Sequence, residues 1–514
     1  MLRLTQTAVT IALYVTFLLS PSFSASRITT NDGNTLVGEI ERLQDGIYSV
    51  RTPYGTVRIP SRAVRRIESI EGSGTGDMGA AHRRTGILRF AGSNTIGAAL
   101  VPELLKQYAK VGGANDLREQ RGGDEDWSLH AVTADGDFRA DVASHGSATA
   151  VTALVEGHAD VGMMSRPIKA EEVNALAATG FGEVNAPGQE HVIALDGIVV
   201  LVNKANPITE LSLADIAAIF SGAVTDWSQL GGQPGSIRVL ARDDKSGTFD
   251  TFKTLVLRDR KLVSSAQRYE NSEELSDEVA SNPNGIGFTG IAYVRNARAV
   301  AIRSDCGLSF APTSFAVKTE EYPLSRRLFL YTEQHLTNPL VGDFVDYALS
   351  ESGQAVAEEK GFVSLRPELS AAGYTATRIA LAARDQQSDP KVFAAFAKGV
   401  VNGVRLSITY RFRPGESQLD ARAVRDVDRL AEFLNRNGNR GRMVLAGFSD
   451  SRGAPARNKQ LAAQRAATVA RELRRHNVNP AAVVGYGQIA PVACNTSPEG
   501  LEKNRRVEVW LFSH

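Results

Sequence analysis

Three junctions of similar chemistry, each lying where an apolar run gives way to a helical pattern, constrain this chain most. They read Gly92-Ser93-Asn94-Thr95, His145-Gly146-Ser147-Ala148-Thr149 and Lys245-Ser246-Gly247-Thr248. The apolar runs predict strands, and the spacing that follows predicts helices. Strands that alternate with helices predict an α/β domain with a largely parallel sheet. In such a sheet the junctions lie at the carboxyl ends of the strands, where ligands bind.

These junctions predict an anion site. The first backbone N–H groups of a helix have no partner within it, and small hydroxyl residues with glycine let an anion approach them. Arg242 adds a permanently charged, forked donor just before the third junction. A capped helix start is the alternative for any one junction, but three in one α/β region favour a shared oxyanion site. His145 either contacts the anion or is an ordinary loop histidine.

Composition excludes several classes of function. The 514 residues include 58 basic and 57 acidic residues, for a net charge of +1, so we expect no general attraction to nucleic acid. The sequence shows no metal-ligand cluster and no nucleophile–base spacing, which predicts a binding protein without metal or cofactor rather than an enzyme. The two cysteines, Cys306 and Cys494, exclude a disulfide-rich scaffold and leave their own pairing open.

The chain divides by pattern into successive segments. Residues 1–25 have a charged start, a short apolar run and small residues, which predicts a secretory signal peptide, with a retained membrane anchor as the alternative. Residues 26–71 alternate β-formers with turns and predict a small β-barrel-like domain. A Gly-rich linker over 72–84 follows. We expect an α/β domain over 85–367, a linker with a helical piece over 368–403, and an α+β domain over 404–514.

Several motifs in the α/β segment support a family resemblance. They are Gly92-Ser93-Asn94-Thr95-Ile96, Gly157-His158-Ala159-Asp160-Val161-Gly162, Ser165-Arg166-Pro167, Asp226-Trp227 and Arg242-Asp243-Asp244-Lys245-Ser246-Gly247-Thr248. Together they resemble the periplasmic phosphate-binding proteins (PstS type) of ABC importers. The resemblance implies a bilobed type II periplasmic-binding-protein fold that closes over one dehydrated anion. It also implies phosphate-binding positions, with Asp244 holding Arg242; these positions are Ser93, Asn94, Thr95, Ser147, Arg166, Arg242, Ser246, Gly247 and Thr248.

Arg166 departs from the pattern of this family, in which well-known members have aspartate at that place. A carboxylate accepts the proton of hydrogen phosphate, whereas a guanidinium only donates. Discrimination of phosphate from sulfate is therefore open, and a salt-bridged surface arginine is the alternative role for Arg166.

The C-terminal segment carries a second resemblance. Gly447-Phe448-Ser449-Asp450, Asn458 with Leu461, Arg465-Ala466, Gly485-Tyr486-Gly487 and Asn504-Arg505-Arg506-Val507 resemble the OmpA-like peptidoglycan-binding domain. The resemblance implies that Asp450 and Arg465, with Asn458, bind the diaminopimelate of the peptide stem. One carboxylate for its ammonium and one forked cation for its carboxylate suit that zwitterion. A purely structural salt bridge is the alternative.

These readings combine into one expectation. The protein is exported to the periplasm, is associated with peptidoglycan on the outer-membrane side, and captures inorganic phosphate or a related oxyanion in a closing cleft. An ABC importer or a sensor is a possible partner. The alternatives are a structural envelope protein whose bilobed domain binds no anion and, more remotely, a phosphate-ester hydrolase.

Overall fold

The computed structural model describes most of the chain from Ser26 to Phe512. The described ranges are 26–30, 35–44, 47–52, 55–60, 64–69, 86–122, 125–133, 136–186, 188–244, 246–383, 389–412, 419–436 and 442–512. The expected signal peptide (1–25) and the expected linker (72–84) lie outside these residues. The chain separates into two compact units, residues 1–82 and 83–514.

The first unit is a curled antiparallel sheet. Its strands are β1 (Ser26–Thr30), β2 (Thr35–Gln44), β3 (Ile47–Thr52), β4 (Gly55–Pro60) and β5 (Val64–Ser69), in the order β4-β3-β2-β1-β5. Ile28, Val50 and Ile59 form its small core because alternate residues of each strand point to the same face.

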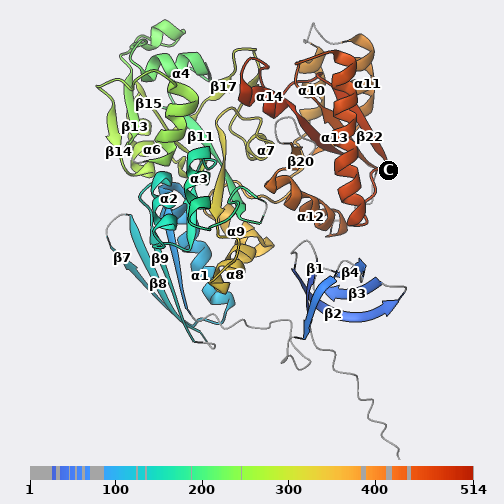
Figure 1. Cartoon of the computed structure of the whole chain (residues 1–514). Coiled ribbons are helices and arrows are strands. Elements are labelled where there is room, and N and C mark those ends of the chain that lie inside the picture. Colours follow the sequence, from blue (N-terminus) through green and yellow to red (C-terminus); the bar gives the residue numbers. More distant parts are fainter. Residues whose placement is uncertain are drawn as a thin grey trace, which may run out of the picture. The chain divides into compact units, whose positions relative to one another are not determined.

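One long mixed sheet organises the first part of the second unit (Figure 1). Its order is β14-β13-β15-β11-β19-β10-β6-β9-β8-β7. The strands are β6 (Gly86–Gly92), β7 (Asp116–Arg121), β8 (Asp126–Thr133), β9 (Gly136–Ala143), β10 (Val161–Met164), β11 (Glu190–Val202), β13 (Arg238–Arg242), β14 (Gln267–Tyr269), β15 (Gly285–Gly290) and β19 (Ser325–Tyr331). The expected largely parallel sheet is wrong in part, because β7, β8 and β9 form an antiparallel meander.

Two antiparallel strands, β11 and β19, pass from one lobe to the other. The first half of β11 pairs with β19, and its second half pairs with β15. β19 also pairs with β10 of the first lobe. Nearly all of β11 is buried, as expected for a strand covered on both faces. The two lobes therefore meet on this pair of strands, which confirms the bilobed α/β fold.

Helices cover both lobes. They are α1 (Val101–Val111), α2 (Ser147–Val155), α3 (Ala170–Ala178), α4 (Leu213–Phe220), α5 (Gly247–Phe252), α6 (Ser272–Ser281), α7 (Ser314–Lys318), α8 (Pro339–Leu349) and α9 (Glu351–Glu359). Tyr108 of α1 packs edge-on against Phe138 of β9 and Phe344 of α8 in the first lobe. Phe252 of α5 stacks on Phe288 of β15 in the second.

The C-terminal part is an α+β domain built on one four-stranded sheet. Its sheet has the order β20-β23-β21-β22, formed by β20 (Val404–Arg411), β21 (Arg442–Phe448), β22 (Ala482–Gly487) and β23 (Arg506–Phe512). The helices α12 (Ala421–Arg436) and α13 (Pro455–Arg475) cover one face and share a core with it. A short helix, α14 (Pro498–Asn504), precedes β23.

Residues 368–403 do more than connect two domains. They contain α10 (Tyr374–Ala383) and α11 (Pro390–Val400). Phe396 of α11 packs edge-on against Phe448 and Tyr486 of the C-terminal sheet, and Ala382 joins the same core. The segment expected as a linker with a helical piece is thus a layer of two helices on the second face of that sheet.

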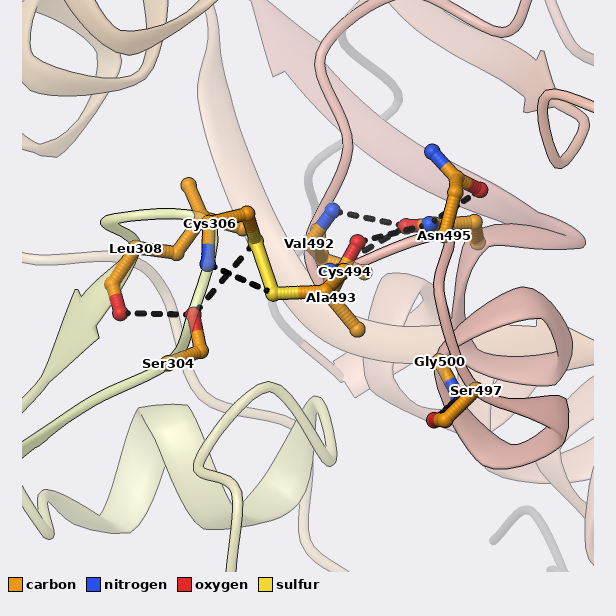
Figure 2. The surroundings of a disulfide bond; sticks show 10 residues. Ser304, Cys306, Leu308, Val492, Ala493, Cys494, Asn495, Ser497 and Gly500 are labelled. Atoms are coloured by element: carbon orange, nitrogen blue, oxygen red, sulfur yellow. Dashed lines mark hydrogen bonds between the residues drawn. A yellow bond between two sulfur atoms is a disulfide. The ribbon is translucent and has the colours of Figure 1, made fainter. Parts of the chain in front are cut away.

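A disulfide joins the two parts of this second unit (Figure 2). Cys306, in the loop between β17 (Ala301–Arg303) and β18 (Ser309–Phe310), bonds to Cys494, in the loop before α14. Buried ion pairs support the same interface: Arg405 with Glu321, and both Arg411 and Arg422 with Glu320. Within the described residues, no helix is long and apolar enough to cross a membrane.

Candidate functional site

Two threonines from different lobes lie in contact with each other. Thr95 follows β6, and Thr248 lies in the first turn of α5. Their Oγ1 atoms are 3.4 Å apart, and both side chains are buried. The structure thus brings together residues from the first and third junctions of the sequence.

Arg326 of β19 links these two threonines. Its Nη2 donates to Thr95 Oγ1 at 3.2 Å and to Thr248 Oγ1 at 3.0 Å. Its Nε and Nη2 also donate to Asp196 Oδ2 of β11, at 3.0 and 2.6 Å. The two charged residues are directly paired across β11 and β19. A fully buried carboxylate and a nearly buried guanidinium compensate each other here.

Sequence reasoning missed Arg326 and Asp196. The available signal was a charged residue inside an otherwise apolar strand, at Ala194-Leu195-Asp196-Gly197-Ile198 and at Arg326-Arg327-Leu328-Phe329-Leu330. A charge in such a run is rarely buried unless it is paired.

Ser147, Ser165 and Gly247 form a second cluster beside the threonines. Ser147 Oγ lies 3.3 Å from Ser165 Oγ and accepts a hydrogen bond from Ser165 N at 3.1 Å. A Cβ atom on Gly247 would lie 2.5 Å from Ser165 Oγ, so this approach requires glycine. Ser246 is the N-cap of α5, and its Oγ accepts from the backbone N–H groups of Thr248 and Phe249. The second and third junctions therefore also meet.

The first junction presents an unused hydroxyl. Ser93 is fully buried, and its Oγ has no hydrogen-bond partner among the residues that the structure describes. A buried polar group without a partner is costly, so a bound ligand would satisfy it. Close approach of the loops depends on Gly92, whose φ is +132°, because a Cβ there would lie 2.1 Å from Met163 O.

Asn94 lies at the edge of this cluster. Its Nδ2 donates weakly to Glu125 Oε1 at 3.5 Å. His145 is held between two carboxylates, with Nδ1 2.5 Å from Glu125 Oε2 and Nε2 2.8 Å from Asp126 Oδ1. Desolvation lowers the pKa of His145, but hydrogen bonds to these carboxylates outweigh it and raise the pKa overall. The ring thus contacts acidic neighbours.

Arg242 is buried, but its donors point to another loop. Its Nε donates to Tyr269 O at 3.2 Å, Nη2 donates to Glu270 O at 2.6 Å, and Nη1 donates to Ser272 Oγ. Burial lowers the pKa of Arg242. In this conformation the guanidinium supports the start of α6 rather than the threonine pair.

The expectation that Asp244 holds Arg242 is wrong. The side chain of Asp244 is exposed and pairs with Arg268, with Nη2 2.6 Å from Oδ1. The carboxylate near Arg242 is that of Asp243, 3.5 Å from Nη2. The sequence motif shows where the acidic partner of Arg242 lies in the chain, but it does not show which of two adjacent aspartates is that partner.

Arg166 lies next to Ser165 with its charge already matched. Its Nη1 and Nη2 donate to the two carboxylate oxygens of Glu172, at 2.8 and 2.7 Å, and Nε lies 3.5 Å from Asp250 Oδ2. The hydrogen bonds that Arg166 donates to Glu172 are the main cause of the raised pKa of Arg166. The geometry is that of a bidentate structural pair.

The C-terminal domain gathers its three predicted residues around one charged cluster. Asp450 Oδ2 accepts from Arg505 Nη1 at 2.8 Å, and Asn458 Nδ2 donates to Asp450 O at 3.2 Å. Arg465 lies over the Phe412 ring, 5.5 Å from its centroid. Burial and the neighbouring Arg505 lower the pKa of Arg465, and Asp450 opposes that shift. Two cations thus surround one carboxylate, which favours a ligand that brings a carboxylate of its own.

Comparisons with known proteins match both domains. Residues 120–352 match the PBP superfamily domain, and residues 411–505 match the OmpA family. Phosphate-binding protein PstS of Staphylococcus aureus (strain USA300) is 26% identical over 321 residues, covering 59% of this chain and 95% of that protein. Phosphate-binding protein PstS of Pseudomonas aeruginosa (strain PAO1) is 28% identical over 291 residues, covering 52% and 88%.

Solved structures are also similar. A putative phosphate ABC transporter substrate-binding protein with bound phosphate from Clostridium perfringens is 26% identical, with a TM-score of 0.41, and covers 54% of this chain and 99% of its own. An ABC-type phosphate transport receptor from Vibrio cholerae is 22% identical, with a TM-score of 0.43 and coverage of 54% and 99%. Both resemblances drawn from the motifs are confirmed by the family matches: a domain of the PBP superfamily is followed in this chain by a domain of the OmpA family.

Proposed function

We propose that the bilobed domain captures inorganic phosphate or a related oxyanion, without catalysis. The observation that carries this proposal is the meeting of Thr95 and Thr248, from different lobes, on Arg326. The unpartnered Ser93 hydroxyl supplies a further buried donor. An anion that replaces the threonine contacts on Arg326 would gain charge-assisted hydrogen bonds from both lobes. The PstS relatives, which are named as phosphate-binding proteins, support the same reading.

Capture requires a change in the cleft. In the described conformation the guanidinium of Arg326 is satisfied by protein groups alone. An anion would bind preferentially to an arrangement in which the lobes separate and then close again on it, which shifts an existing equilibrium. Two loops would form the sides of the anion site. One carries Ser93, Asn94 and Thr95, and the other carries Ser246, Gly247 and Thr248. Ser147 would lie beside them.

Whether the site prefers phosphate to sulfate depends on hydrogen-bond acceptors that can take the proton of hydrogen phosphate. Asp196 is the carboxylate that pairs with Arg326, but its Oδ2 accepts from Arg326 and its Oδ1 accepts from Ile291 N at 3.1 Å. Arg166 brings no acceptor to replace it. The cleft is therefore rich in donors, and we expect sulfate to compete with phosphate.

Titration calorimetry of the full chain with phosphate, with and without sulfate, tests this function. We expect phosphate to bind and sulfate to weaken the apparent affinity. A folded protein that binds neither anion would favour the alternative, a structural envelope protein. That alternative has one observation in its favour: Arg166 and Arg242 are already engaged by protein groups.

We further propose that the OmpA-family domain holds the protein on peptidoglycan through Asp450, Asn458 and Arg465. The carboxylate of Asp450 would accept from the ammonium of a diaminopimelate stem, and Arg465 would bind its carboxylate. On this proposal the protein would be exported by a signal peptide to the periplasm and would lie on the outer-membrane side, where it would serve an importer or a sensor.

Cosedimentation with purified peptidoglycan tests the attachment. Asp450→Ala should remain in the supernatant, whereas the matched variant Asp428→Ala, on the exposed side of α12, should pellet like the wild type. Equal pelleting of both variants would contradict the assignment of Asp450.

A further inference from the structure

A cavity of about 400 Å³ lies in the second lobe. Its walls come from α5, from a π-helical turn η4 (Lys253–Leu257), from the segment 258–266 and from strand β14. Neither Thr95 nor Thr248 lines it, so the cavity is separate from the proposed phosphate site. Its volume falls in the range of small-molecule sites.

Hydrogen-bonded backbone holds the segment that closes this cavity. Arg258 ends η4 with a φ of +54°, a left-handed conformation that is uncommon for a residue with a side chain. Val263 N donates to Phe220 O at 2.8 Å, and Ala266 N donates to Val263 O at 3.1 Å. Strand β14 follows and pairs in parallel with β13. The walls are therefore parts of the folded lobe.

Apolar side chains form one part of the lining. Those of Phe249 and Leu257 are buried, and three others are partly buried: Leu262, Val263 and Ala266. Covering such groups with an apolar body removes apolar surface from water, which is favourable.

Basic side chains form the other part. Lys253, Arg260, Lys261 and Arg268 line the cavity, and Asp244 is the one acidic residue of the described lining. Asp244 is already paired with Arg268. The other three basic side chains are exposed and form no ion pair with any residue that the structure describes. The cavity therefore has positive charge that an anion could match.

Arg268 lies where the apolar and basic parts meet. Its guanidinium lies over the ring of Phe249, 4.2 Å from the centroid, and Nη2 lies 2.6 Å from Asp244 Oδ1. These two contacts hold a cation beside the apolar wall. An acidic group attached to an apolar body would meet this cation.

From this lining we propose that the second lobe has a further binding site for a small amphipathic anion, a carboxylate carried on an apolar chain or ring. The apolar body packs against Phe249 and Leu257, and the carboxylate lies among Lys253, Lys261 and Arg268. A cationic ligand would be repelled by these side chains, and an anion without an apolar body would leave the apolar wall in water. The site does not depend on the proposed phosphate site.

Calorimetry of the full chain with octanoate, acetate and octylammonium tests this proposal. Octanoate has both an apolar body and a negative charge, acetate lacks the body, and octylammonium has the opposite charge. We expect octanoate to bind at least about tenfold more tightly than either of the others. Equal affinity for octanoate and one of the others, or no binding of octanoate by the folded protein, would overturn the proposal.

Variants assign octanoate binding to the cavity. Lys253→Gln with Lys261→Gln removes two cations of the lining, and Ala266→Glu adds a carboxylate to it. Each should weaken octanoate binding at least about tenfold. The matched pair Lys110→Gln with Lys204→Gln changes two exposed lysines outside the lining and should bind octanoate like the wild type. Octanoate affinity that the cavity variants leave unchanged, or that the matched pair lowers equally, would overturn the proposal.

A phosphate titration of the same proteins separates this proposal from the proposed function. All of these variants should bind phosphate like the wild type, because none of the changed residues belongs to the threonine pair or to its arginine. Loss of octanoate binding with unchanged phosphate binding supports two separate sites. Equal loss of both ligands would contradict them.

Discussion

Arg326 and Asp196 face each other across the two strands that join the lobes, with Nη2 2.6 Å from Oδ2 and both side chains buried. The same guanidinium reaches Thr95 and Thr248. The carboxylate therefore sets the position of a cation that both lobes touch.

Replacing Asp196 by Asn should weaken phosphate binding about 10- to 100-fold, because Arg326 would lose its compensating charge and its fixed orientation. Calorimetry of the full chain measures this. Asp116→Asn, on the exposed strand β7 and paired with Arg118 at the surface, is the matched control and should bind like the wild type. Unchanged affinity in a folded Asp196→Asn protein would refute this role.

Loss of the Cys306–Cys494 disulfide should lower the free energy of unfolding by about 2–4 kcal/mol, since the bond closes a loop of 188 residues in the unfolded chain. Urea denaturation of the wild type and of the Cys306→Ser, Cys494→Ser double variant measures the difference. Coincident unfolding curves would show that the bond does not form or adds nothing. The buried ion pairs at the same interface should keep the double variant folded.

The ion pair between Arg405 and Glu321 is buried on both sides. Glu321→Gln should therefore destabilise the protein by about 3 kcal/mol, because it leaves a buried guanidinium with less compensation. Glu351→Gln removes a carboxylate from the exposed pair with Arg436 and should cost less than about 1 kcal/mol. Similar losses for the two variants, measured by denaturant unfolding, would be inconsistent with a buried interface.

Acid should destabilise the protein through Glu508. Burial raises the pKa of this carboxyl, but Arg405, Arg506 and Arg378 outweigh it and lower the pKa from 4.5 to about 2. Because the pKa in the folded state is depressed, the stabilisation is present above the unfolded value and is lost as the pH falls from about 4.5 toward 2.

The Glu508→Gln variant isolates this contribution. Between about pH 6 and pH 3 the wild type should lose about 2 kcal/mol more unfolding free energy than the variant. Denaturant unfolding at the two pH values measures the difference. Equal losses in both proteins would show that Glu508 is not held by these arginines.

Much of the fold follows from local patterns. The three junctions do lie between strands and helices because glycine and N-cap residues such as Ser246 mark helix starts without help from distant parts of the chain. The α10–α11 layer was missed as a layer because its partners, Phe448 and Tyr486, are far away in sequence. A short amphipathic helix shows its apolar face but not which surface covers it.

The candidate site was predictable only in part. The hydroxyl and glycine residues at the junctions could be predicted from the sequence because helix starts require them. Arg326 and Asp196 come together through the pairing of β11 with β19, 130 residues apart. The sequence marks each of them as a charge within an apolar strand but does not show that these two strands pair. The sequence also does not predict the direction of a side chain. Arg242 and Asp244 lie in the expected motif, yet Asp244 pairs with Arg268.

The most direct test of the account compares the wild type with Thr248→Val in a phosphate titration of the full chain. Valine keeps the shape of the threonine and removes the hydroxyl that meets Thr95 and Arg326. We predict one phosphate site in the wild type and at least about tenfold weaker binding in Thr248→Val. Equal affinity in the two proteins, or no binding by the folded wild type, would contradict an oxyanion site between the lobes.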